Sequence, residues 1–237
     1  MEKISETMKV FLSAKWNNLI NITYAVDPKV LLPHLPKGLN LDMVDGKAFV
    51  SFVAFEFNEV RVKGFKIPFH RNFPEINLRF YVNKNGKRGV VFIKEYVPKY
   101  LVALIANKIY NEPYSAIKMQ SSNQKTEEDI KVMHTFCINK EWFNLAVIAE
   151  KTSYLPEKDS IEHFFKEHEI GFGKDKKNTT LEYKVEHPVW EIHAIKNVES
   201  TICFEKIYGA KWAFLDLEKP FNVLLAKGSE VKVFDKQ

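Results

Sequence analysis

Residues 75–82 read Glu-Ile-Asn-Leu-Arg-Phe-Tyr-Val, in which polar and apolar side chains strictly alternate. Successive side chains of a β-strand point to opposite faces, so this pattern predicts a strand with one polar and one apolar face. The polar face carries Glu75, Asn77, Arg79 and Tyr81. A carboxylate, an amide, a guanidinium and a phenol in one row can line a cavity and orient a polar ligand. A solvent-exposed strand face, or a buried Glu–Arg pair that only orders the fold, explains the same pattern.

Turn signals on both sides extend this strand into a sheet. Asn85-Gly86 is a two-residue hairpin turn, and it predicts that the apolar residues 89–96 return beside the strand. Asp45-Gly46 predicts another hairpin, between residues 40–44 and residues 47–58. The second of these segments is apolar on both faces, which favours a strand buried on both sides, as in a closed or covered sheet.

The rest of the chain adds strands and three short helices. One helix is predicted to begin at Pro28, with Asp27 as its N-cap. A second is predicted over residues 98–110, and a third from a capping box that opens at Asp159. Extended segments are expected at residues 16–26, 114–119, 130–138, 142–151, 179–186, 190–198 and 213–216.

Length and composition agree with one mainly β domain. The 237 residues include 19 Phe and 9 Tyr, which favour strands. No repeat or Pro/Gly/Ser-rich linker divides the chain, so a single domain over residues 1–237 is expected. No apolar stretch reaches the roughly 18 residues of a transmembrane helix, so no membrane partner is expected. Residues 1–6 are charged and lack the apolar segment of a secretory signal, which predicts a cytoplasmic location.

Several classes of function lack a sequence signal. The net charge is only +5 and the basic residues are spread along the chain, without an RNA-binding or recognition-helix motif, so no nucleic-acid partner is expected. The seven histidines form no HExxH motif, and the two cysteines form no CxxC, so no metal is expected. Without a Gly-rich phosphate loop or a GxSxG motif, neither a nucleotide cofactor nor a hydrolase is indicated. A homo-oligomer is left open.

Short motifs occur together along the chain. Residues 70–82, His-Arg-Asn-Phe-Pro-Glu-Ile-Asn-Leu-Arg-Phe-Tyr-Val, are followed by Gly-Val-Val-Phe at 89–92. The others are Leu-Pro-Lys-Gly-Leu at 35–39, Glu-Pro-Tyr at 112–114, His-Pro-Val-Trp at 187–190 and Ala-Lys-Gly-Ser-Glu-Val at 226–231. As a set they resemble the uncharacterised DUF2071 (YqjF-like) family. The resemblance implies an acetoacetate decarboxylase-like β barrel with an internal cavity. One departure is Lys-Glu-His-Glu at 166–169, where the family has Glu-Arg-Tyr.

The resemblance also bears on chemistry. Acetoacetate decarboxylase forms a Schiff base through a lysine that an adjacent cation activates. That lysine lies in a Pro-Lys-Lys stretch, and the similar stretch here reads Pro113-Tyr114-Ser115, which cannot form an imine. Glu75 resembles the cavity glutamate of acetoacetate decarboxylase. Lys94, at the end of an apolar strand, is the lysine best placed to replace the missing nucleophile, although a strand-end lysine ordinarily extends to solvent.

The leading hypothesis is a cavity that binds a small organic acid or carbonyl compound. If the protein transforms it, decarboxylase-like or other lyase-type chemistry without a lysine Schiff base is expected. Arg79 would pair with a carboxylate, Glu75 would act as an acid, base or orienting group, and Tyr114 would donate to a carbonyl oxygen.

Two histidines are further ligand-binding candidates beside Asn77 and Tyr81. His187 belongs to one of the family motifs, and His70 lies close to Glu75 in the sequence. Each is equally explained by a structural role in a turn or at a strand start. Two other functions stay open: a non-catalytic, regulatory small-molecule-binding module, and an interaction protein with a filled core.

Overall fold

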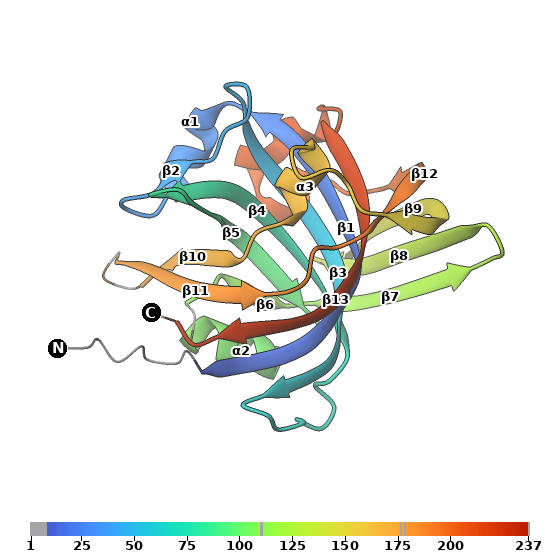
Figure 1. Ribbon diagram of the computed structural model, residues 1–237, viewed down its shortest axis with the longest axis horizontal. Coiled ribbons are helices and arrows are strands. Elements are labelled where there is room, and N and C mark those ends of the chain that lie inside the picture. Colours follow the sequence, from blue (N-terminus) through green and yellow to red (C-terminus); the bar gives the residue numbers. More distant parts are fainter. Residues whose placement is uncertain (1–8, 110, 176, 178, 237) are drawn as a thin grey trace.

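The computed structural model describes residues 9–109, 111–175, 177 and 179–236, and most of this part of the chain is β-strand (Figure 1). The strands are β1 (Val10–Val26), β2 (Asn40–Leu41), β3 (Ala48–Val62), β4 (Phe73–Lys84), β5 (Lys87–Val97), β6 (Tyr114–Ala116), β7 (Lys118–Lys125), β8 (Asp129–Ile138), β9 (Glu141–Tyr154), β10 (Ile170–Lys174), β11 (Thr180–Glu186), β12 (Ile192–Ser200) and β13 (Asn222–Phe234). The helices are α1 (Pro28–Leu31), η1 (Leu32–His34), α2 (Tyr100–Ile109), α3 (Ile161–Lys166), α4 (Phe204–Tyr208) and η2 (Ala210–Asp216). The mainly β fold predicted from the sequence is confirmed.

Seven of these strands close into a ring. Its order is β1, β3, β4, β5, β10, β11 and β13, and β13 pairs back onto β1. Only the β5–β10 pair among these neighbours is parallel. Closure leaves no open edge between the first and last strands, so the backbone groups there are paired rather than exposed.

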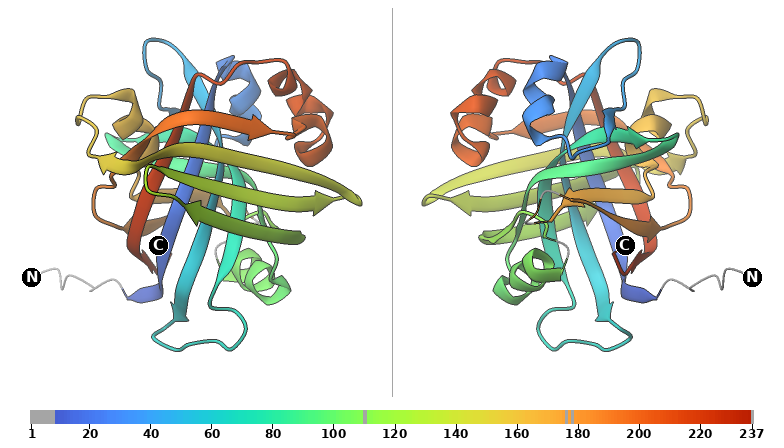
Figure 2. Two further views of the ribbon diagram at one scale, coloured as in Figure 1. Left: turned by 90° about the vertical axis from the view of Figure 1, so that its right-hand side faces the viewer. Right: turned by 90° about the vertical axis from the view of Figure 1, so that its left-hand side faces the viewer.

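A second layer branches from this ring at β13. There β12 pairs with β13, and β9, β8 and β7 follow in order. Figure 2 shows these strands crossing the long strands β1 and β3. A large apolar core lies between the two layers; Phe52 of the ring stacks on Phe136 of β8, with ring centroids 6.2 Å apart.

The alternation along β4 is confirmed, and both faces of the strand are buried. Its apolar residues, Ile76, Leu78, Phe80 and Val82, belong to the core between the layers. Its polar residues therefore point to the other face, into the ring. Both faces of β3 and β4 are therefore buried, one against the core between the layers and the other inside the ring.

In the C-terminal third, one predicted strand is wrong and one strand was missed. Residues 213–216 are not a strand but belong to the 3-10 helix η2, because Trp212 and Leu215, three residues apart, are buried on one helical face. The long strand β13 was not predicted, since Lys227, Gly228 and Glu230 interrupt its apolar pattern. Gly228 adopts a φ of +80°, and a Cβ atom there would lie 1.9 Å from the Trp16 carbonyl oxygen. Glycine is therefore required where β13 passes closest to β1.

Predictions of helix caps and turns from local sequence were more accurate than predictions of which strands pair. The Asp27 side chain caps α1 as predicted, accepting from the Lys29 backbone N–H. The turn at residues 45–46 is present, but β2 pairs with β4 rather than with β3. The third helix begins after Ser160, whose Oγ accepts from the His163 N–H, and not at Asp159. The predicted last residue of the second helix, at position 110, and the N-terminal residues 1–8 lie outside the described residues.

Within the described ranges, no helix is long and apolar enough to cross a lipid bilayer.

Candidate functional site

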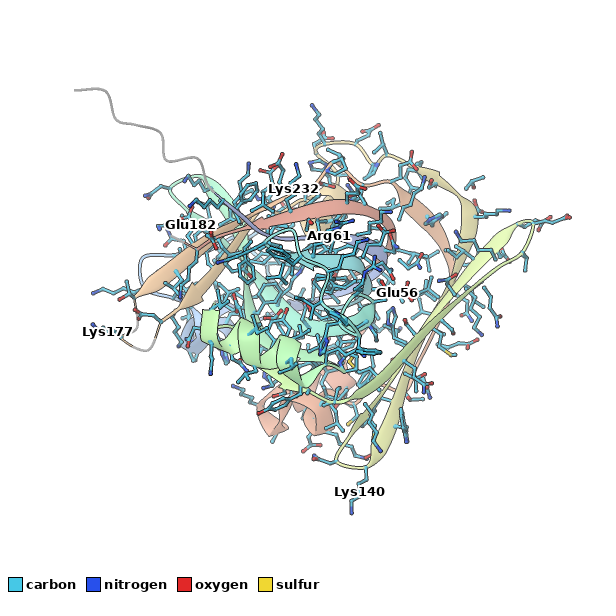
Figure 3. All side chains as sticks on the ribbon, turned by 90° about the horizontal axis from the view of Figure 1, so that it is seen from below. Glu56, Arg61, Lys140, Lys177, Glu182 and Lys232 are labelled. Carbon is cyan, nitrogen blue, oxygen red and sulfur yellow. The ribbon has the colours of Figure 1, made fainter. Side chains whose placement is uncertain are left out.

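A cavity of about 250 Å³ lies inside the ring, and its lining residues come from all seven ring strands. Most of them are apolar, with Trp16, Phe55 and Phe57 among the largest. The helix α2 lies at the lower end of the ring in Figure 1 and faces the viewer in Figure 3, which shows the molecule from below. It contributes Leu101 and Ile105 to the same cavity. The polar lining groups are His70, Glu75, Asn77, Arg79, Glu95, Glu112, Tyr114, His168 and Tyr183. The cavity therefore combines an apolar body with a cluster of ionisable groups.

Strand register brings part of that cluster together. Asn77 of β4 lies opposite Glu95 of β5, and Glu95 lies opposite Tyr114 of the parallel strand β6. Glu75 shares the inward face of β4 with Asn77, two residues away. Three neighbouring strands thus present two carboxyl groups, an amide and a phenol to one region of the cavity.

Hydrogen bonds hold Glu75 in this row. The Tyr114 hydroxyl donates to Glu75 Oε2 over 2.9 Å, and Asn77 Nδ2 donates to Glu75 Oε1 over 3.2 Å. Arg79 lies further along the strand and donates from Nη2 to the Phe165 carbonyl oxygen over 3.2 Å. Its guanidinium is thereby fixed at the cavity wall, four residues along β4 from Glu75.

Burial makes the carboxyl groups weak acids. It raises the pKa of Glu75 to about 7, although hydrogen bonds from Tyr114 and Asn77 oppose the shift. Burial raises the pKa of Glu112 to about 8, against a hydrogen bond with Tyr183. The pKa of Glu95 lies well above its ordinary value because of burial and of the neighbouring charges on Glu75 and Glu112. Near neutral pH this cluster holds exchangeable protons, so its members can act as acids and as bases.

Lys94 does not line the cavity. In β5, Val90 and Phe92 face the cavity, and simple alternation would place Lys94 on the same side. A bulge at Ile93 shifts the register, because Leu78 pairs with Lys94 while the next residue, Arg79, pairs with Phe92. Lys94 therefore points to the other side. Its Nζ donates to Ser115 Oγ over 2.6 Å, and Glu95 takes the inward position. Among the described residues, no lysine lines the cavity.

Tyr81 belongs to a separate polar network. Its hydroxyl lies 2.5 Å from Ser51 Oγ and donates to the Phe165 carbonyl oxygen over 3.4 Å. Asn21 and Thr23 complete this fully buried network. Tyr81 thus supports the wall that also holds Arg79, and it does not reach the cavity.

The two predicted histidines lie in different places. His70 lines the cavity edge, where its Nδ1 lies 2.8 Å from the Pro68 carbonyl oxygen. His187 stacks on Trp190, with ring centroids 4.1 Å apart, and its Nδ1 lies 3.9 Å from Glu167 Oε2. His187 is absent from the cavity wall, so the structure brings together Glu75, Asn77, Arg79, Tyr114 and His70 and leaves His187 outside.

Four of the polar cavity residues were missed by the sequence interpretation: Glu95, Glu112, His168 and Tyr183. Glu112 belongs to the Glu-Pro-Tyr motif, which was a usable signal. His168 belongs to the segment 166–169 that departs from the family pattern. It is buried, and burial together with the charges of Arg79 and Arg88 holds its pKa well below the ordinary value. No group of three or more His, Cys, Asp or Glu in the described ranges is arranged to hold a metal ion.

Solved acetoacetate decarboxylase-like proteins share this fold. An acetoacetate decarboxylase-like enzyme from Sphingomonas wittichii RW1 superimposes with a TM-score of 0.65 at 13% identity, over 95% of this chain and 91% of its own. The acetoacetate decarboxylase of Legionella pneumophila gives 0.62 at 12% identity, over 99% and 89%. The enduracididine biosynthesis enzyme MppR, complexed with pyruvate, gives 0.64 at 11% identity, over 100% and 92%. The predicted fold class is confirmed.

The chain belongs to the DUF2071 family of uncharacterised conserved proteins, whose family model matches residues 13–230. The resemblance read from the motifs is thereby confirmed. Within that family, the uncharacterised protein YqjF of Bacillus subtilis (strain 168) is 30% identical over 154 residues. The matched part covers 64% of this chain and 63% of YqjF, so the chain spans less than two thirds of that relative's length.

Proposed function

We propose that the protein binds a small organic acid or carbonyl compound in the ring cavity and transforms it by acid–base chemistry without a lysine imine. The observation that carries this proposal is the Tyr114–Glu75 hydrogen bond inside a largely apolar cavity. A glutamate with a pKa of about 7 can both accept and return a proton near neutral pH.

The geometry supports a specific division of roles. A ligand carbonyl oxygen beside Tyr114 would take over the hydrogen bond that the hydroxyl now gives to Glu75. The Glu75 carboxylate would then remove a proton from the carbon next to the carbonyl, and the electron pair of that C–H bond would pass to the carbonyl oxygen as an enolate. Tyr114 would stabilise the enolate oxygen, and Arg79 would pair with a ligand carboxylate. Glu75 exchanges the proton with solvent and returns one to the carbon, so this step replaces the carbon-bound hydrogen and regenerates the carbonyl group.

The comparisons support the ligand class. MppR has this fold and was solved with pyruvate, a small keto acid. A cavity of about 250 Å³ is close to the small end of ligand sites, roughly 300–1,000 Å³, and so suits a small metabolite. The presence of this cavity argues against the alternative function, an interaction protein with a filled core.

Proton exchange at carbon tests the proposal. Levulinate or another small keto acid is incubated with the protein in D₂O, and loss of its proton signals is followed by NMR. We expect exchange above the buffer rate, and its loss in Glu75→Gln. Glu56→Gln is a matched control, because Glu56 is a half-buried strand glutamate that does not line the cavity. Binding without exchange would instead favour the non-catalytic binding module.

A further inference from the structure

Acidic groups outnumber basic ones in the cavity wall. Glu75, Glu95 and Glu112 are 3%, 2% and 5% exposed, and among the described lining residues Arg79 is the only lysine or arginine. A ligand that offers only a carboxylate adds a further negative charge to this region. Arg79 can pair with one such carboxylate, but it leaves the glutamates at the other end without a cationic partner.

Three buried acceptor atoms in the same wall lack donors. They are Glu95 Oε1, Glu112 Oε1 and Asn77 Oδ1, for which the described residues supply no hydrogen-bond partner. Asn77 is only 2% exposed, and its other amide atom already donates to Glu75. A buried acceptor without a donor is unfavourable, because it has given up its hydrogen bonds to water. These three oxygens therefore lack donors, although each carboxyl group has a partner elsewhere: Tyr183 for Glu112, and Tyr114 and Glu75 for Glu95.

The three residues that carry these atoms lie in one region of the cavity wall. Asn77 and Glu95 face each other across β4 and β5, and Glu112 lies close enough to Glu95 for its charge to act on the Glu95 carboxyl. A primary ammonium group carries one positive charge and three N–H donors. It therefore matches three acceptors in an acidic, largely apolar site.

We infer that the ligand of this cavity carries a basic nitrogen, bound by Glu95, Glu112 and Asn77, in addition to the carbonyl or carboxylate that faces Tyr114 and Arg79. This inference rests on the proposed function and narrows its substrate class to amino-substituted keto compounds and acids. Without ligand, protons on the carboxyl groups take the place of the ammonium charge. The ionisable groups that face this region are Glu75 and Arg79 of β4, Glu95 of β5, Glu112 and Tyr114 at β6, Tyr183 of β11, His168 after α3 and His70 before β4.

Paired ligands that differ by one amino group test the inference. The pairs are levulinate with δ-aminolevulinate and butyrate with γ-aminobutyrate, titrated by calorimetry near neutral pH. We expect the amino member to bind at least about tenfold more tightly in the wild type. Glu112→Gln removes the charge but keeps the shape, and it should abolish most of this preference, measured as the ratio of the two affinities within each pair. Glu95→Gln provides a second variant, and Glu56→Gln the control outside the cavity.

The outcomes separate the two proposals. Tight binding of the amino members alone, or a preference for them that depends on Glu112, supports the inference. Equal binding within each pair would mean that water and protons satisfy these oxygens, which overturns the inference and leaves the proposed function intact. A preference that survives in both Glu112→Gln and Glu95→Gln would overturn the assigned contacts. Binding of no member of either pair would overturn both proposals.

Discussion

The Tyr114 hydroxyl lies 2.9 Å from Glu75 Oε2, so two residues that the sequence interpretation singled out separately are in contact inside the cavity. Tyrosine cannot form an imine, but it can donate a hydrogen bond. Position 114 therefore offers the cavity a hydrogen-bond donor and not an amine. Ser115, the next residue, faces away and accepts from Lys94 instead.

Tyr114→Phe is expected to shift the pH dependence of the exchange reaction. The hydrogen bond from Tyr114 lowers the pKa of Glu75, so its removal should raise that pKa above about 7. Exchange that needs the Glu75 carboxylate would then begin at higher pH, by about one pH unit for a net hydrogen bond of roughly 1.4 kcal/mol. The pH–rate profile of deuterium exchange checks this. An unchanged profile with a lower plateau would show that Tyr114 does not act on Glu75.

The contribution of Glu75 and Glu112 to the stability of the protein is expected to fall as the pH rises from about 5 to about 8. The folded-state pKa values of Glu75 and Glu112, about 7 and 8, lie above their ordinary value of 4.5. The folded state therefore binds more protons, and this contribution is fully present below pH 4.5 and lost as the pH passes the folded values. Urea unfolding of Glu112→Gln should show a shallower loss, by on the order of 1–3 kcal/mol at pH 8. A steeper loss in the variant would contradict the assignment.

Gly228→Ala is expected to destabilise the ring closure severely. The new Cβ would lie 1.9 Å from the Trp16 carbonyl oxygen, so β1 and β13 would have to separate locally. A loss of about 3 kcal/mol or more in urea unfolding is expected. Gly86→Ala is the matched control. Gly86 has a similar φ of +85° but nothing within 4 Å of the added atom, so it should cost only about 1 kcal/mol.

Lys94→Met is expected to leave ligand exchange unchanged. Lys94 lies outside the cavity wall and binds Ser115, so only a small loss of stability, below about 1 kcal/mol, should follow. Exchange rates and urea midpoints of the variant check this. Loss of exchange in a folded Lys94→Met protein would revive Lys94 as the relocated nucleophile.

The sequence predicted the structure correctly where a pattern depends only on residues that are close together in the chain. The alternation along β4 predicted the inward row because neighbouring side chains must point in opposite directions. Asp27, capping α1 through its own side chain, was predictable for the same reason. The strand β13 was not, because its burial depends on distant strands that close the ring around it.

The candidate site was predictable only in part. Glu75, Asn77 and Arg79 followed from one strand, and Tyr114 from the family resemblance. Glu95 was hidden because the bulge at Ile93 reverses which of two adjacent residues faces the cavity, and no sequence signal marks that bulge. His168 and Tyr183 come from distant segments, and only the ring closure brings them to the site.

Borohydride treatment followed by the exchange assay tests the central claim most directly. The protein is incubated with levulinate, reduced with borohydride, freed of small molecules, and then examined by intact mass and by its rate of deuterium exchange into fresh levulinate. An acid–base site built on Glu75 and Tyr114 predicts an unchanged mass and full exchange activity, while acetoacetate decarboxylase treated in parallel gains mass and loses activity. A mass increase on any lysine, accompanied by loss of exchange, would show that the protein works through an imine and would contradict the proposed chemistry.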